Sequence, residues 1–142
     1  MSNFRVGLRQ SLAAHLLNKT QAGEHVYVSR RSPLVELQTY PVVLIYGGPE
    51  IPTRVTMGSG VYQRIYSVTI ESRVARVMDL GELDSIDDEF DLIADEIEHE
   101  MKAFVLPGLL DVIYVGAEPE LSDESDTPFG SLKMRFDFKY VS

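Results

Sequence analysis

Apolar residues recur along this chain with two different spacings, which separate the predicted helices from the predicted strands. Residues 3–18 carry apolar side chains three and four positions apart, from Phe4 to Leu16, and this spacing predicts an amphipathic helix. Gly23, a few positions later, offers the chain a left-handed exit from it. Residues 84–104 repeat the helical spacing with acidic residues at most remaining positions, so a second and strongly acidic helix is predicted there.

Five other segments have the composition or the alternation of strands: 26–28, 40–48, 61–77, 112–115 and 132–140. The third would reach about 55 Å if fully extended, which exceeds the span of a domain of this size. We therefore expect it to bend, bulge or project, and to do so at its Tyr62 end. Segments 49–60 and 118–130 combine proline, glycine or several acids without a steady period, and they are predicted loops.

The predicted element order is therefore α-β-β-β-α-β-β. Short links and alternating strands predict an α+β fold, with a mostly antiparallel sheet of four to five strands and two helices packed on one face. The chain has 142 residues, of which 44% are hydrophobic. This length and composition suit one domain, residues 1–142, with a core of its own.

Charge and cysteine content narrow the range of functions. The chain has 22 acidic and 13 basic residues, a net charge of −9, whereas a free-standing nucleic-acid binder depends on an excess of Lys and Arg. DNA is expected to be repelled rather than bound. The lack of cysteine excludes disulfides and thiolate metal sites. No apolar run approaches the ~20 residues that a bilayer requires, and the first residues do not form a signal peptide, so a cytoplasmic product without membrane contact is expected.

Two patterns match catalytic or metal-binding motifs only in part. Glu96-x-x-His99 has the spacing of half a di-iron carboxylate site, but the second half and two further glutamates have no predicted source. Gly47-Gly48 follows a predicted strand without the Lys and Ser or Thr of a phosphate loop. We therefore predict no catalytic residues, no cofactor and no bound metal, and a protein that is not an enzyme.

Two charged features each have a structural and a functional interpretation. Arg30 and Arg31, on a predicted turn, are either two solvated charges or a docking point for an acidic neighbour, such as the second helix of another copy. The acids of that helix either form a solvated face or make a surface that binds cations or that DNA slides past.

Several features follow one another along essentially the whole chain: an N-terminal amphipathic helix, Val26-Tyr27-Val28-Ser29-Arg30-Arg31-Ser32-Pro33, Tyr40-Pro41 opening an apolar strand that ends at Gly47-Gly48, a long alternating strand, an acidic helix from Asp84, and an alternating strand through Tyr140. This succession, with the size and acidity of the chain, resembles the tail terminator proteins of long-tailed bacteriophages, the lambda-type minor tail protein U family. The Tyr40-Pro41 strand is the most specific part of the resemblance.

The resemblance implies a hexameric ring that caps the finished tail tube, stops its polymerisation and offers a surface for head joining. The implied partners are further copies of the chain, the tail tube protein and a head-completion or connector protein, while DNA passes through the lumen without specific binding. The implied location is the head-proximal end of the virion tail, after assembly in the host cytoplasm. The candidate interface residues are Arg30, Arg31, Glu50, Arg54, Met57, Tyr62, Asp84, Asp88, Asp123 and Asp126.

Three alternatives remain open from the sequence. A neck or tail-completion protein would bind at the same head-tail junction. A small metal-dependent carboxylate hydrolase would use the acids of the second helix, and its turnover would depend on Mg²⁺. A host adaptor domain would bind a host protein and no tail component.

Overall fold

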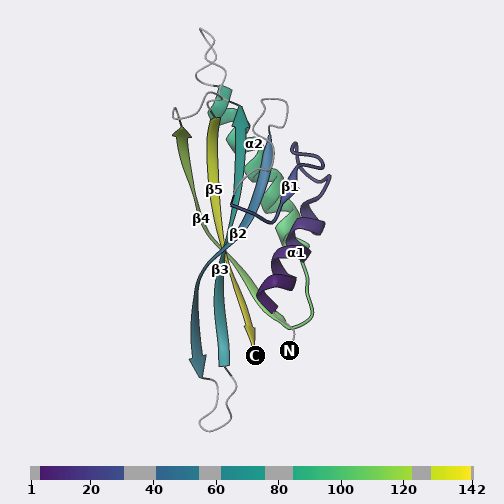
Figure 1. The fold of residues 1–142 in the computed structure, drawn as a ribbon, viewed down its shortest axis with the longest axis vertical. Helices are drawn as coiled ribbons and strands as arrows, with labels where there is room; N and C mark the ends of the chain where they lie inside the picture. Colours follow the sequence, from purple (N-terminus) through teal and green to yellow (C-terminus); the bar gives the residue numbers. More distant parts are fainter. Residues whose placement is uncertain (1–3, 31–40, 55–61, 76–84, 123–128, 142) are drawn as a thin grey trace.

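The computed structural model describes residues 4–30, 41–54, 62–75, 85–122 and 129–141 (Figure 1). Its elements are α1 (Phe4–Leu16), β1 (Val26–Tyr27), β2 (Val42–Arg54), β3 (Tyr62–Ala75), α2 (Ser85–Lys102), β4 (Leu109–Ser122) and β5 (Phe129–Val141). The predicted order α-β-β-β-α-β-β is confirmed. Neither of the described helices combines the length and apolar content needed to cross a membrane.

The five strands form one sheet in the order β1-β2-β3-β5-β4. The short β1 runs parallel to β2, and the other three pairings are antiparallel. The long strands twist strongly about one another, and both helices lie on the same face of the sheet (Figure 1). The predicted α+β fold class, with its mostly antiparallel sheet, is therefore confirmed.

The core lies between the two helices and the face of the sheet that they cover. Alternate residues of β3 and β5 point toward the helices, which accounts for the period of two in their sequences. Each large apolar side chain buried in this way stabilises the fold by about 1.5–3 kcal/mol. The fully buried core side chains include Leu8, Leu12, Leu16, Ile70, Ile93, Ile97, Met134 and Phe138.

The long strand projects where the sequence predicted that it would. β2 ends and β3 begins beyond the reach of the helices, at the lower end of Figure 1. The register of the β2–β3 pair also shifts between Gly47 and Glu50, so the bulge lies in β2 rather than in β3. A bulge increases the local twist of a strand pair. Beyond the bulge, the two arms of the hairpin turn away from the helical layer (Figure 1).

Both predicted loops are wrong in part, because strands continue into them. β2 runs through residues 49–54, and β4 runs through residues 118–122. These stretches contain Pro49, Pro52 and Pro119, and they lie at edges of the sheet as described, where a missing N–H disturbs no neighbouring strand. The rest of the first predicted loop, 55–60, and the middle of the second, 123–128, lie outside the described residues.

The first helix is shorter than its pattern predicted. It ends at Leu16 rather than at residue 18, and Asn18 adopts a left-handed φ of 60°. Asparagine tolerates this conformation better than most residues, so it stops the helix two positions early. Gly23 also has a left-handed φ, of 58°, as its position predicted, although the helix has already ended by then.

Candidate functional site

The predicted interface residues are dispersed over the fold. Arg30 lies after β1, Glu50 and Arg54 lie in the second half of β2, Tyr62 opens β3, and Asp88 is exposed in the first turn of α2. The other five fall outside the described residues: Arg31, Met57, Asp84, Asp123 and Asp126. Their predicted role at interfaces remains a proposal.

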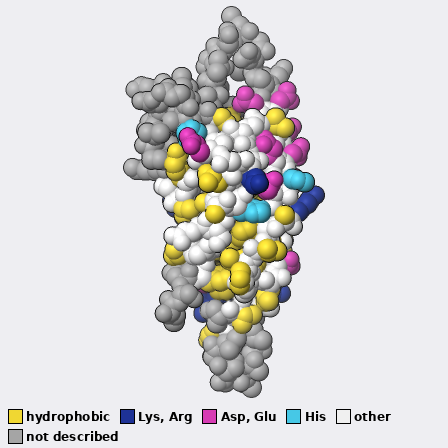
Figure 2. All heavy atoms as spheres, turned by 90° about the vertical axis from the view of Figure 1, so that its right-hand side faces the viewer, with side chains coloured by type: hydrophobic (Ala, Val, Ile, Leu, Met, Phe, Trp, Pro, Cys, Tyr) yellow, Lys and Arg dark blue, Asp and Glu magenta, His cyan; other side chains and the backbone are white. Residues whose placement is uncertain are grey.

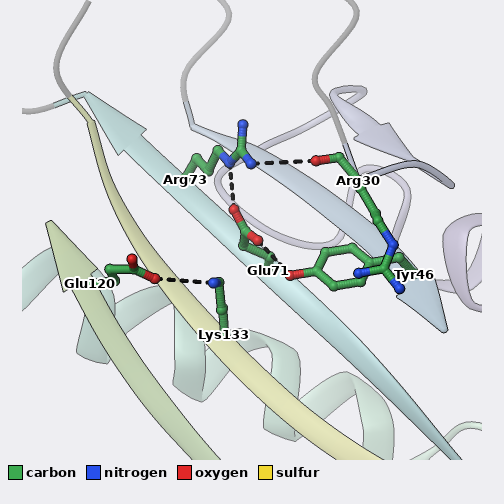
Figure 3. Close-up of polar contacts among 6 residues, drawn as sticks. All are labelled: Arg30, Tyr46, Glu71, Arg73, Glu120 and Lys133. Carbon is green, nitrogen blue, oxygen red and sulfur yellow. Dashed lines mark hydrogen bonds and ion pairs between the residues drawn. The ribbon is translucent and has the colours of Figure 1, made fainter. Parts of the chain in front are cut away.

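Arg30 belongs to a polar network at the edge of β2 (Figure 3). Its guanidinium lies 4.6 Å from the centre of the Tyr46 ring and donates a hydrogen bond of 2.7 Å to the Gly47 carbonyl. The Tyr46 hydroxyl and the Arg73 guanidinium both donate to the carboxylate of Glu71, which is buried on the sheet face away from the helices. Burial raises the pKa of the Tyr46 hydroxyl well above its usual range, and the hydrogen bond to Glu71 raises it further. Arg30 is therefore anchored in its own chain while it stays exposed to partners.

Glu50 fastens the base of the projecting hairpin to the body of the fold. Its side chain, only 13% exposed, accepts hydrogen bonds from the Tyr140 hydroxyl and from Arg64, at 3.2 Å, and lies 3.6 Å from the Arg5 guanidinium of α1. The Tyr140 ring stacks on Phe4, with 4.2 Å between the ring centres. Burial, followed by the hydrogen bond to Glu50, raises the pKa of Tyr140 to about 12. The sequence predicted a loop at Glu50, whereas the residue lies in β2 and joins that strand to α1, β3 and β5.

An apolar groove of about 580 Å³ lies between the C-terminal half of α2 and the start of β4. Its lining includes Met101, Phe104, Val105, Leu110 and Tyr114. Val105 is 85% exposed and Leu110 is 55% exposed, so both apolar side chains are open to a partner. Groups of exposed apolar side chains are typical of interaction sites, so the groove is a candidate interface.

Hydrophobic side chains gather over the lower half of the helical face in Figure 2, whereas acidic side chains gather over its upper half. The helical face is thus divided into an apolar part and an acidic part. The groove was not predicted from the sequence, although the sequence contains one signal for it. The stretch 103–115 is almost continuously apolar, which is more than a strand with one buried face requires.

β4 itself is an edge strand of 14 residues, and within the described part of the chain its outer side pairs with no other strand. An uncovered edge presents unpaired N–H and C=O groups that another chain can pair with. The β4–β5 register shifts twice, near Leu110 and near Val115. Such bulges shape the edge, so that only a partner with a matching contour can pair along it.

The partial metal motif does not assemble into a site in the described structure. Glu96 accepts a hydrogen bond of 3.0 Å from Gln21, and His99 is exposed on α2. Among the described residues, no group of three or more His, Asp or Glu side chains is placed to hold a metal ion.

No protein-family model matches this chain, and no curated protein matches it either. A solved structure that does match is titled "Virion of native gene transfer agent (GTA) particle". The two chains are 16% identical, the match covers 90% of this chain and 84% of that chain, and the TM-score is 0.44. A likeness of this degree does not establish a common function.

Proposed function

We propose that this protein is a virion assembly protein, which forms a hexameric ring at the head-proximal end of a phage tail. The ring caps the tail tube, stops its polymerisation and provides the surface for head joining. The observation that carries the proposal is the open edge of β4 beside its exposed apolar groove. The succession of features along the sequence, which resembles the tail terminators of long-tailed phages, supports the same role.

The two edges of the sheet differ, and this favours a ring over a simple pair. One edge carries the short β1 and the second half of β2, and the other carries β4 with the groove. A contact between unlike surfaces is heterologous, so a pair of copies keeps one unused surface of each kind. Repetition of that contact closes a ring when the rotation between copies allows it. The number of six copies comes from the resemblance.

A terminator must bind the tube end more tightly than it binds itself. The net charge of −9 on each copy opposes association between free subunits. The β2–β3 hairpin extends beyond the helical layer, and it carries Ile51, which is 62% exposed (Figure 1). We assign this projecting end to the tube contact, because an exposed apolar side chain such as Ile51 is stabilised when a partner surface covers it. The exposed acids at the start of α2, Asp87, Asp88 and Glu89, suit a lumen through which DNA passes without binding.

Light scattering and negative-stain imaging of the purified protein test the ring. We expect closed rings whose population rises with protein concentration, at low and at high Mg²⁺. A strict monomer at all concentrations, with no ring when tail tube is added, would rule the proposal out. Turnover that depends on Mg²⁺ and is abolished by one Asp substitution in α2 would favour the hydrolase alternative instead.

A further inference from the structure

A second pocket, of about 510 Å³, lies at the edge of β2 just past the end of β1. Three arginines line it: Arg5 and Arg9 from α1, and Arg30 from the segment after β1. Arg5 and Arg9 are four residues apart on the helix, so both side chains project from the same face of α1. No acidic residue lines this pocket within the described structure, although acids outnumber basic residues in the chain.

Each of these arginines is positioned by a contact that leaves donors available. Arg9 donates to the Tyr66 hydroxyl, Arg30 donates to the Gly47 carbonyl, and Arg5 lies 3.6 Å from Glu50. A guanidinium carries five N–H donors, so one contact fixes its position without exhausting its capacity. Fixed guanidinium groups that converge on one pocket recognise carboxylates in particular, because the planar fork matches the two oxygens.

The acids of α2 divide into two sets according to the side of the helix on which they lie. Glu96 and Glu100 face α1, where Glu96 accepts a hydrogen bond from Gln21 and Glu100 lies 4.0 Å from the His15 ring. Asp91, Asp95 and Glu98 form a stripe at helical spacing on another side, and Glu98 lines the apolar groove beside β4. This acidic stripe is thus on the β4 side of the molecule, away from the arginine pocket.

We propose that the arginine pocket receives the acidic stripe of a second copy of this chain. The inference rests on the proposed ring, and it names the charged contact within it. In a ring whose copies meet β4 edge to β2 edge, the α2 side of one copy faces the α1 side of the next. Carboxylates from Asp91, Asp95 and Glu98 then meet guanidinium groups from Arg5, Arg9 and Arg30. This contact offsets at the interface the repulsion that the net charge causes elsewhere.

Complementary charge reversal tests the contact. The pocket variant is Arg5→Glu with Arg30→Glu, and the stripe variant is Asp91→Arg with Asp95→Arg. Each alone brings like charges together, so we expect its association constant to fall about tenfold or more in sedimentation equilibrium at low salt. An equimolar mixture pairs each reversed pocket with a reversed stripe, and we expect it to recover rings in which the two variants alternate, as native mass spectrometry would show.

The control variant is Lys19→Glu with Lys139→Glu, which changes the net charge by the same amount as the pocket variant and lies outside the pocket. We expect it to assemble much as the wild type does, and circular dichroism must show that all variants fold. If the pocket variant cannot fold, Arg5→Gln with Arg30→Gln is used against the same stripe variant, and a smaller loss of association is expected.

Three results would overturn the inference. They are normal assembly of both variants alone, a mixture no better than its parts, and a pocket variant that assembles normally while it loses binding of inorganic phosphate. The last result would show a site for free oxyanions instead. Rings that form normally in both variants leave the proposed tail function standing, because another contact then builds them. Normal tail tubes in cells without the protein would refute that function and leave the charged contact standing.

Discussion

The hydroxyl of Tyr66 occupies the space that a side chain on Gly47 would need. A Cβ built on Gly47 lies 1.8 Å from that oxygen and 2.8 Å from the ring carbon that bears it. Tyr66 is only 3% exposed, and its hydroxyl accepts a hydrogen bond from Arg9. Because Gly47 has no side chain, the Tyr66 side chain of β3 can pass over the backbone of β2 at this position, next to the bulge.

Gly47→Ala should therefore destabilise the fold by about 1–3 kcal/mol, because the buried tyrosine must move. Urea unfolding measures the change. Gly7→Ala is the matched control, since Gly7 is exposed in α1 and a Cβ built on it points into open space. Alanine there should stabilise the helix by about 0.5–1 kcal/mol. Equal effects at the two positions would contradict the packing described around Tyr66.

Glu71 and Glu120 offer a second matched pair, since each carboxylate contacts a cation (Figure 3). Glu71→Ala removes a buried carboxylate and leaves Tyr46 and Arg73 without their shared acceptor, so we expect a loss of roughly 3–5 kcal/mol. The Glu120 side chain is 61% exposed and pairs with Lys133, so Glu120→Ala should change stability by less than about 1 kcal/mol. Chemical denaturation of both variants measures the two changes in the free energy of unfolding. A Glu71 variant as stable as the Glu120 variant would show that the network is not structural.

Alkaline pH should weaken the fold through its buried tyrosines. The pKa of Tyr140 is raised from 10.0 to about 12, so its neutral form is favoured in the folded state. The stabilisation is complete below pH 10 and is lost as the pH rises toward 12, because the unfolded chain releases the proton first. Urea midpoints at pH 8, 10 and 11 should fall accordingly. The Tyr140→Phe variant should lose less stability than the wild type over this pH range. Part of the loss should remain in the variant, because the pKa of Tyr46 is also raised.

The groove should matter for association and hardly at all for folding. Val105→Asp with Leu110→Asp places charges on exposed positions, so the free energy of unfolding should change by about 0.5 kcal/mol or less for each. The ring contact would have to bury those charges, and we expect the association constant to fall about tenfold or more. Sedimentation equilibrium measures this, with Val141→Asp as a control on an exposed apolar residue at the end of β5, which is not an edge strand. Unchanged association would remove the groove from the interface.

The elements that build the core could be predicted from the sequence, because the core dictates their period. Residues of α2 such as Phe90, Ile93 and Ile97 meet the sheet at every turn, and alternate residues of β5 meet the helices. These patterns survive in any arrangement of the elements. The predicted helices and the alternating strands predicted over 61–77 and 132–140 are accordingly confirmed, and their ends differ by a few residues.

The strand ends at sheet edges could not be predicted in the same way. Pro49 and Pro119 indicate loops in the sequence, yet an edge strand accommodates proline because its outer N–H groups need no partner strand. The position of an edge is a property of the whole sheet, and no local pattern contains it. The candidate surfaces depend on the same information, since the arginine pocket joins Arg5 and Arg30 from segments that only the fold brings together.

Tail-tube length, measured by electron microscopy in cells that make tails with and without this protein, tests the proposed termination most directly. We expect over-long tubes when the protein is missing and normal length when it is restored. Tubes of normal length whose tails fail to join heads would contradict termination and favour the neck-protein alternative.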